Sequence, residues 1–542
     1  MTLPLLLSVF AITSICIPFV YLAGKKSPKA AAIFVAAIAV LNMILVAATI
    51  PEILHSTSHQ YIETYTWIPT IIQTEFTLFT DGISVSIALI SLILIFVASL
   101  YSINYMAGKK NLPVYYALLC MLSVGLIGVF LTSNLILFYF CWELMLVPAY
   151  FIVGEWGYRN SYKSALKLFI FTHAGAVFVL LGIGAVYWLT GYTDMLQAQT
   201  ALMTAAPDIV KWVLIALTAG FAVKMAVFPV HMWLPDAHSE APAPMSALLS
   251  GVIISAGAYA IIRISFGMVF PAVGVAFGTE FLHVLSIFGV ITAFYGSLLS
   301  LAANDIKRVI AYSSIAHMGY IMFGLSLFPV ALANGDTVLL ASASAIAVVG
   351  TILHIITHAA SKGLFFLTAG GVMHQTEERD IRKMGGLASK MPFSAVSGTI
   401  AALSIAGIPP LACFISEFFM FVGAFQILTV DSFYIIPTAL MLIATVFSLA
   451  YSLRFISKVF LGRSKNELKM IEDRNGSHDE NNLLENNGVV VNKLDAHIHK
   501  IVDVPNYMKF ALALLIVLVV IIGVYPTLFM QLIQTVTFGP VV

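Results

Sequence analysis

Four charged side chains lie inside long apolar stretches of the chain, where an ionised group is costly. They are Glu143, Lys224, Lys362 and Glu417. Charges at bilayer depth are rare and usually belong to a proton or ion pathway. Desolvation disfavours the charged form of a carboxylate or an ammonium, and an opposite charge nearby favours it, so a Glu143–Lys224 pair would switch proton affinity. A static ion pair that holds two helices together is the alternative.

Three titratable residues, His354, His358 and Lys362, follow one another at intervals of four. On a helix this spacing forms one stripe about 12 Å long. Because histidine titrates near neutral pH, the stripe can pass protons through bridging waters. His173 and His317 are two further relay candidates in other apolar segments.

Two other roles are open to this stripe. A histidine pair four residues apart can bind a metal ion, but no carboxylate in the neighbouring sequence completes a ligand set, so we expect no metal. A single histidine can instead hydrogen-bond a neighbouring helix, which is the simplest interpretation of His354.

Prolines lie close to two of the four charges. Pro229 follows Lys224, and Pro409 and Pro410 precede Glu417. Proline removes a backbone hydrogen bond and kinks or breaks a helix. Helices broken at corresponding places in two halves of a transporter indicate its ion path. We therefore predict broken helices in the seventh and twelfth membrane spans; a packing kink without a transport role is the alternative.

The composition of the 542-residue chain is that of an integral membrane protein. Apolar residues make up 60% and charged residues 10%, against about 25% charged residues in a soluble protein. A net charge of +1 creates no field that attracts nucleic acid, so no such partner is expected. The four cysteines form no CxxC motif, which disfavours cysteine-ligated zinc and iron–sulfur clusters. We therefore predict an all-α polytopic membrane protein.

Fourteen apolar segments are long enough to cross a bilayer, which takes about 20 residues. They lie at residues 3–23, 29–49, 82–106, 114–131, 134–153, 164–191, 209–229, 243–266, 281–303, 307–329, 337–373, 391–425, 434–458 and 508–535. Loops after odd-numbered spans carry most of the lysines and arginines, and loops after even-numbered spans carry acids. The positive-inside rule then places both termini outside. With this orientation, the polar segment 463–504 is expected to be a hydrophilic loop on the inside.

Several motifs resemble those of the antiporter-like membrane subunits of respiratory complex I. The most specific is FPVHMWLPDAH at 228–238, followed by EAPAP at 240–244. Similar motifs occur at 134–143, 304–320 and 383–386, in the order that the family has. A glutamate at position 417, where sister subunits commonly have lysine, resembles the M type, which includes mitochondrial chain 4 and subunit M of NADH-quinone oxidoreductase. Archaeal deazaflavin-linked and ferredoxin-linked relatives belong to the same group.

The resemblance implies a fold of fourteen transmembrane helices with two inverted five-helix repeats. Five segments follow from it: three N-terminal spans at 1–111, the repeats at 112–266 and 267–460, the inside loop at 461–506 and the last span at 507–542. It also implies that the chain moves protons. The expected path consists of Glu143, Lys224, Lys362, His317, His358 and Glu417. In it, Glu143 tunes Lys224, and Glu417 releases the proton to the outside.

The resemblance further implies what surrounds the chain. It would be a non-redox subunit of a proton-translocating oxidoreductase in the plasma or inner membrane, next to other membrane-arm subunits. No cofactor is expected in this chain; flavin, iron–sulfur clusters and a quinone-type acceptor would belong to partner subunits. A subunit of a multi-subunit sodium/proton antiporter is the alternative, and a non-pumping scaffold is a third possibility.

One position departs from the family pattern. M-type chains commonly have their central lysine in the eighth span, at the position that aligns with Ser255, and serine does not titrate there. Lys362 lies in a His-x3-Lys pattern that is typical of the sister subunits. We therefore expect Lys362 to supply the central site.

Overall fold

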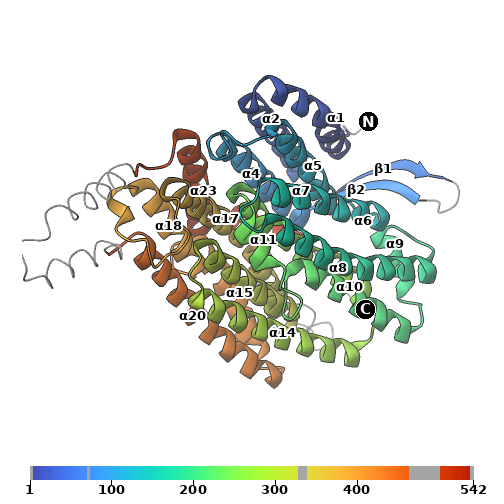
Figure 1. Ribbon diagram of the computed structural model, residues 1–542. Helices are drawn as coiled ribbons and strands as arrows, with labels where there is room; N and C mark the ends of the chain where they lie inside the picture. The colour runs from blue at the N-terminus through green and yellow to red at the C-terminus, as the bar shows by residue number, and fades with distance from the viewer. Residues whose placement is uncertain (1–3, 70–73, 328–338, 463–500, 537–542) are drawn as a thin grey trace, which may run out of the picture.

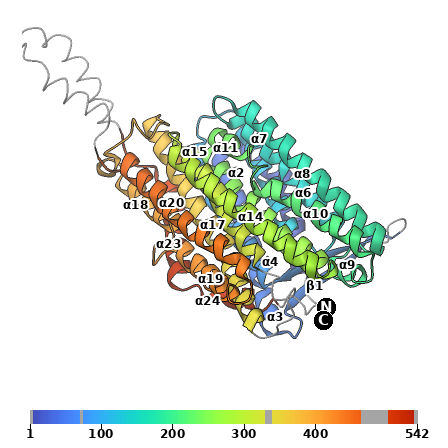
Figure 2. The ribbon, with the colours of Figure 1, turned by 90° about the horizontal axis from the view of Figure 1, so that it is seen from below.

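Helices run through nearly all of the residues that the structure, a computed structural model, describes: 4–69, 74–327, 339–462 and 501–536 (Figure 1). Most of them lie side by side along one direction, with a β-hairpin and α9 at one end of the bundle (Figure 1; Figure 2). The predicted helical membrane fold is therefore confirmed. The hairpin is an addition, made of two antiparallel strands, β1 (Gln60–Ile68) and β2 (Thr74–Asp81).

The helices fall into two groups along the chain. The first group contains α1 (Leu5–Lys26), α2 (Pro28–Ala47), α3 (Ile50–His55), α4 (Gly82–Tyr105), α5 (Leu112–Phe130), α6 (Leu135–Leu144), α7 (Leu146–Trp156), α8 (Ser161–Thr190), α9 (Met195–Leu202), α10 (Pro207–Met225), α11 (Leu234–Glu240), α12 (Ala243–Leu248) and α13 (Ile254–Ala260). The rest are α14 (Val275–Ala302), α15 (Ile306–Ser326), α17 (Leu339–Thr376), α18 (Pro392–Ile405), α19 (Ala412–Ile427), α20 (Ile435–Val459), α23 (Asn506–Val524) and α24 (Thr527–Gln534).

Among the described residues, 12 helices are long and apolar enough to cross a membrane. The seventh and twelfth expected spans are not among them, because one carries three charges and the other is divided. α10 contains Asp208, Lys211 and Lys224, and the chain interrupts the twelfth span between α18 and α19. Both predicted breaks are confirmed. The count of fourteen, the inverted repeats and the segment boundaries stay predictions, and most of the predicted 463–504 loop lies outside the described residues.

Acidic loops gather at the end of the bundle that holds the hairpin, which we call the acidic end. The Glu63 carboxylate in β1 accepts hydrogen bonds of 2.9 Å from the backbone N–H groups of Leu6 and Leu7. These donors belong to the first turn of α1, which has no partner for them within the helix. Asp194 caps α9 and also accepts a hydrogen bond from Ser133 at 2.6 Å. The hairpin and the acidic loops therefore fix the helix ends on this side.

Basic loops lie at the other end, which we call the basic end. α4 starts beside Asp81 at the acidic end and rises about 36 Å over its length, which carries Lys109 to the far side. Lys109, Arg159 and Arg379 line one pocket there. Hydrogen bonds from Arg382 stabilise the charged form of Asp380 and lower the pKa of that carboxyl to about 2. The segregation of charge read from the sequence is present in the fold; which end faces inside stays a prediction.

Small residues bring α14 and α15 close together, which fixes the position of His317. A Cβ atom added at Gly319 would lie 2.4 Å from the backbone nitrogen of Ala293, and one at Gly296 would lie 2.4 Å from that of Ala316. Glycine at such points lets two membrane helices approach to backbone contact. α15 is therefore held against α14 with His317 buried on the opposite side, toward α17 and α20.

Candidate functional site

Lys224 lies one residue before the end of α10, at the predicted break. Ala226 has a left-handed φ of 58°, and the chain becomes helical again at Leu234. The Lys224 ammonium donates a hydrogen bond of 2.9 Å to the backbone carbonyl of Trp142 and lies 4.0 Å from the centre of the Trp142 ring. A carbonyl oxygen and an aromatic face both stabilise a cation in an apolar environment. Lys224 is therefore buried beside α6 with partners that carry no formal charge.

Glu143 forms no direct ion pair with Lys224, although both residues lie in the described part of the chain. The Glu143 carboxylate instead lies 3.2 Å from Nδ1 of His173 on α8, and these side chains are 26% and 49% exposed. The static Glu143–Lys224 ion pair that was the alternative is therefore absent from the described residues, and the tuning of Lys224 by Glu143 stays a prediction.

Lys362 lies on α17 and is completely buried. Its ammonium donates to the hydroxyl of Ser313 at 2.5 Å and to the carbonyl of Ile310 at 3.4 Å, both on α15. As at Lys224, both hydrogen-bond acceptors are uncharged oxygens. Such a lysine is poised to change protonation when a nearby charge moves, because little compensates for its desolvation.

Histidines from two helices form a hydrogen-bonded chain next to Lys362. Nδ1 of His317 on α15 lies 3.1 Å from Nε2 of His354 on α17. The outer nitrogens also have partners: the hydroxyl of Tyr451 lies 3.2 Å from Nε2 of His317, and that of Ser416 lies 2.9 Å from Nδ1 of His354. All four ring nitrogens are engaged, so a proton added at one ring can be passed to the other. His354 bonds neighbouring helices, as its simplest interpretation predicted, and through His317 it also belongs to this hydrogen-bonded chain.

Glu417 joins this histidine pair from α19, shortly after the break of the twelfth span. One carboxylate oxygen and one ring nitrogen each from His317 and His354 lie within 4.8 Å of one another. The sequence argument against a metal ion assumed that no carboxylate was near, and this assumption was wrong, because α19 supplies one. Histidine and carboxylate are ligands that suit zinc. In the structure the two ring nitrogens bond each other, which is the arrangement of a proton relay.

His358 lies between His354 and Lys362 on α17 and is fully buried. Neither of its ring nitrogens has a hydrogen-bond partner among the described residues. Buried polar groups without a protein partner are usually satisfied by ordered water. His358 is therefore a buried imidazole beside Lys362 whose hydrogen-bonding capacity is not used by any described residue.

The structure thus brings together most of the predicted residues on its α15–α17–α19 side. His317 and Glu417 meet there beside His354, and Lys362 lies on the same helix as His354. The sequence reasoning missed three hydroxyls: that of Tyr451 bonds His317, that of Ser416 bonds His354 and that of Ser313 bonds Lys362. Nothing in the sequence singles out these hydroxyls, since serine and tyrosine are common in membrane helices.

Ser255, at the position that usually carries a central lysine, is buried in α13 between two π-helical segments, Leu249–Ile253 and Ile261–Val269. Its hydroxyl donates to the carbonyl of Gly251 in its own helix at 3.0 Å. This side chain therefore satisfies the local backbone, and the assignment of the central site to Lys362 stays a prediction.

Comparison with known proteins gives the family. Residues 132–447 match the family described as NADH:quinone oxidoreductase/Mrp antiporter, transmembrane. Subunit M of NADH-quinone oxidoreductase from Pseudomonas aeruginosa is 34% identical over 406 residues, 71% of this chain and 74% of that protein. Subunit M from Rickettsia conorii is 32% identical over 452 residues, which cover 82% of this chain and 85% of that protein.

Solved structures agree on the fold. A chain of respiratory complex I from Thermus thermophilus is similar with a TM-score of 0.76 and 21% identity, covering 97% of this chain and 98% of that one. A chain of the Mrp complex from a Dietzia species gives a TM-score of 0.77 with 19% identity, over 98% and 97% of the two chains. At these identities the likeness concerns the fold alone.

Fold and site together define a multi-pass, antiporter-like membrane protein with titratable groups buried between its helices. The chain belongs to the NADH:quinone oxidoreductase/Mrp antiporter transmembrane family. The relatives from Pseudomonas and Rickettsia are subunits of an enzyme complex, NADH-quinone oxidoreductase.

Proposed function

We propose that this chain is a proton-translocating membrane-arm subunit of a complex I-like oxidoreductase. The observation that carries the proposal is the contact of His317, His354 and Glu417 across three helices, with Lys362 on the same helix as His354. Buried groups with this chemistry are costly in a membrane and serve proton transfer better than packing.

The proposed path starts at the basic end, which we take to face inside. A proton passes from Lys224 to Lys362, assisted by His358, and then to the His317–His354 pair. It leaves through Glu417, which is 7% exposed, whereas the other members of this cluster are closed off. Glu143 sets the electrostatic potential at Lys224. Electron transfer takes place in partner subunits, which hold flavin or iron–sulfur clusters and a quinone-type acceptor, and this chain carries no redox cofactor.

The test is the proton yield per electron of the assembled complex in sealed vesicles. Glu417→Gln preserves the shape of the side chain but cannot release a proton, so assembly and electron transfer should persist while this subunit's share of the proton yield is lost. Glu155→Gln is the matched control, because Glu155 is an exposed carboxylate on α7 bonded to Tyr162 at 2.8 Å. An unchanged proton yield in Glu417→Gln would refute the proposal.

Glu143→Gln tests the electrostatic role separately. It should leave assembly intact and abolish most of the subunit's coupled pumping, because glutamine brings no charge near Lys224. A normal proton stoichiometry in this variant would remove Glu143 from the mechanism while leaving the exit residues in place.

A subunit of a multi-subunit sodium/proton antiporter is the second candidate, favoured by the fold shared with the Mrp complex. The two functions differ in their energy source. Sodium-dependent proton movement in vesicles that have no electron donor would favour the antiporter, and proton movement that requires the electron donor would favour the oxidoreductase.

A further inference from the structure

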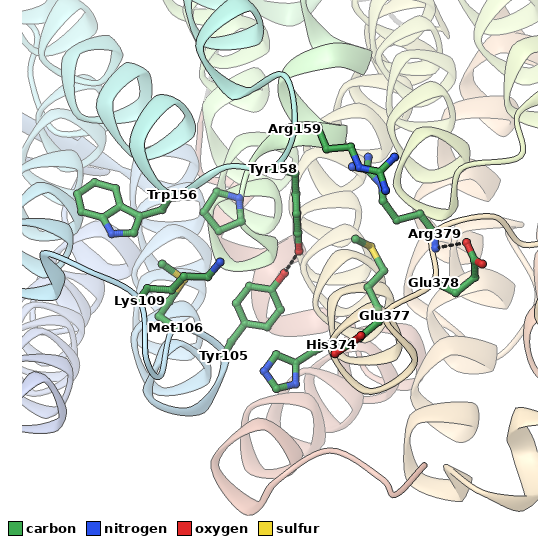
Figure 3. Close-up of a pocket in the computed structure, with 12 residues that line it drawn as sticks. Tyr105, Met106, Lys109, Trp156, Tyr158, Arg159, His374, Glu377, Glu378 and Arg379 are labelled. Carbon is green, nitrogen blue, oxygen red and sulfur yellow. Dashed lines mark hydrogen bonds between the residues drawn. The ribbon is translucent and has the colours of Figure 1, made fainter. Parts of the chain in front are cut away.

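A cavity of about 300 Å³ opens at the basic end, between α4, α7 and the end of α17 (Figure 3). We call it the basic-end pocket; its lining includes Tyr105, Lys109, Tyr158, Arg159, His374 and Glu377. Charges of both signs and aromatic hydroxyls line it, so water enters it readily. None of the four charged residues of the proposed path lines this pocket.

Two tyrosines form the inner wall of the basic-end pocket. The hydroxyls of Tyr105 and Tyr158 point toward each other and are hydrogen-bonded (Figure 3). The ring of Tyr158 lies 5.2 Å from the Arg379 guanidinium and 5.5 Å from the Lys307 ammonium. Tyr158 therefore lies between the open pocket and the buried Lys307 ammonium.

Lys307 is the first buried group behind these tyrosines. It is completely inaccessible, and its ammonium donates to the carbonyl of Ala241 at 2.5 Å. Arg379, which lies against the same Tyr158 ring as Lys307, forms ion pairs with Asp305 at 2.7 Å and with Glu240 at 3.4 Å. Lys307 thus has the same combination as Lys224 and Lys362, a buried ammonium bonded to neutral oxygen atoms.

His238 continues the series toward Lys362. It is fully buried on α11 and stacks on Phe366 of α17, 4.9 Å between ring centres, one turn from Lys362. Neither of its ring nitrogens has a hydrogen-bond partner among the described residues, and the same is true of His358 on the other side of Lys362. Packing alone does not explain two buried, unpartnered histidines around one lysine, whereas water molecules between them do.

The spacing along α17 gives these groups an order. His374 lines the pocket, and Lys362 lies 12 residues earlier, about 18 Å away along the helix axis. Phe366, and with it His238, falls between them. The distance from the pocket to Lys362 is too long for a single proton transfer, and the buried titratable groups lie at shorter intervals along it.

We propose that Lys362 takes up protons from the basic end through this pocket, by way of the Tyr105–Tyr158 pair, Lys307 and His238, on a route separate from Lys224. Each hydroxyl accepts one proton from the side of the pocket and gives up its own toward the interior, so the tyrosines end unchanged. Lys362 first releases its proton toward the histidine pair and is then reprotonated through His238, which accepts a proton from Lys307 at one ring nitrogen and gives one up at the other. Lys307 regains its proton through the tyrosines, with water between these groups. The inference rests on the proposed function, because it names a source of protons for that path.

The first test removes one hydroxyl. Tyr158→Phe retains the ring that faces Lys307 and Arg379 but breaks the hydrogen bond to Tyr105. The proton yield per electron should therefore fall part of the way toward that of Glu417→Gln, because the route through Lys224 stays open. Tyr115→Phe is the matched control: this buried tyrosine on α5 bonds Ser102 at 2.9 Å and packs against the ring of Trp156, but it does not line the pocket. It should keep the normal yield.

The second test blocks the pocket without changing the path. Lys109→Cys places a thiol in the lining, and a bulky membrane-impermeant maleimide added from the basic-end side should then lower the proton yield. Lys110→Cys is the control, because Lys110 is the next residue, is exposed as well and does not line the pocket. The native cysteines are buried, apart from the half-buried Cys16.

The outcomes separate the two proposals. A normal proton yield in both Tyr158→Phe and labelled Lys109→Cys, with a reduced yield in Glu417→Gln, would overturn this entrance and leave the proposed function standing. A normal yield in all three variants would overturn both. A density map of the complex that shows no water beside His238 would also contradict the entrance.

Discussion

Lys224 and Lys362 are two buried lysines with different surroundings. Lys224 meets an aromatic ring and a carbonyl of α6, and the nearby Glu143 is partly exposed and bonded to His173. Lys362 meets a hydroxyl of α15 and lies on the helix that carries two buried histidines. Among the described residues, the first region places one buried ammonium beside an aromatic ring, whereas the second places His317, His354 and Glu417 within contact of one another. The buried titratable groups are therefore unevenly distributed in this fold, and most members of the proposed path lie in the second region.

The largest effect is expected from Lys362→Met, which removes the central titratable group of the second region. Methionine fills a similar volume, so the complex should assemble, while this subunit's proton yield should be lost. Ser255→Ala is the control, because the Ser255 hydroxyl bonds only its own helix in the described structure. Proton yield per electron in vesicles is the measurement. A loss in Ser255→Ala with a normal yield in Lys362→Met would reverse the assignment of the central site.

The next effect concerns the first region and asks whether Lys224 carries the proton or only a charge. Arginine can reach the Trp142 carbonyl and stack on its ring, but it does not release a proton in proteins. Lys224→Arg should therefore assemble and still lose nearly as much proton yield as Lys224→Met. If Lys224→Arg pumps normally, the first region supplies a fixed charge and protons enter elsewhere.

A smaller effect is expected from Tyr451→Phe, which removes one hydrogen bond from His317. Such a bond contributes about 1 kcal/mol, so the pumping rate should fall by about fivefold to tenfold without a complete loss. Tyr434→Phe is the control, because the Tyr434 hydroxyl is equally buried but bonds the carbonyl of Ser326 at 2.9 Å, away from the relay. Equal rates in both variants would mean that the orientation of His317 does not limit transfer.

The smallest effect is expected from His173→Gln. Its contact with Glu143 is half-exposed, and exposed ion pairs contribute at most about 1 kcal/mol. Glutamine can still donate a hydrogen bond to the carboxylate, so the proton yield should stay near normal and the rate should change by about twofold or less. A complete loss of pumping would move His173 into the transport path and weaken the division between the two regions.

The sequence was sufficient for much of the fold and for the identity of the charged residues. Pro229 and Pro410 marked the two broken spans, which the structure contains. It left open whether Glu143 pairs directly with Lys224, because spacing along the chain does not say which way a side chain turns at the bundle surface. It also missed Tyr451 and Ser416, whose hydroxyls become part of the site only where α20 and α19 meet the histidines.

The sequence by itself determined that the chain spans a membrane and that Glu143, Lys224, Lys362 and Glu417 stand out, because apolar runs and the cost of burying charge are local properties. Only the tertiary structure decided which of these groups meet. His317, His354 and Glu417 lie on three helices far apart in the chain, and the close packing of those helices sets the distances between them. Hydrogen bonds act over about 3 Å, so a relay exists only where packing has brought its members to that range.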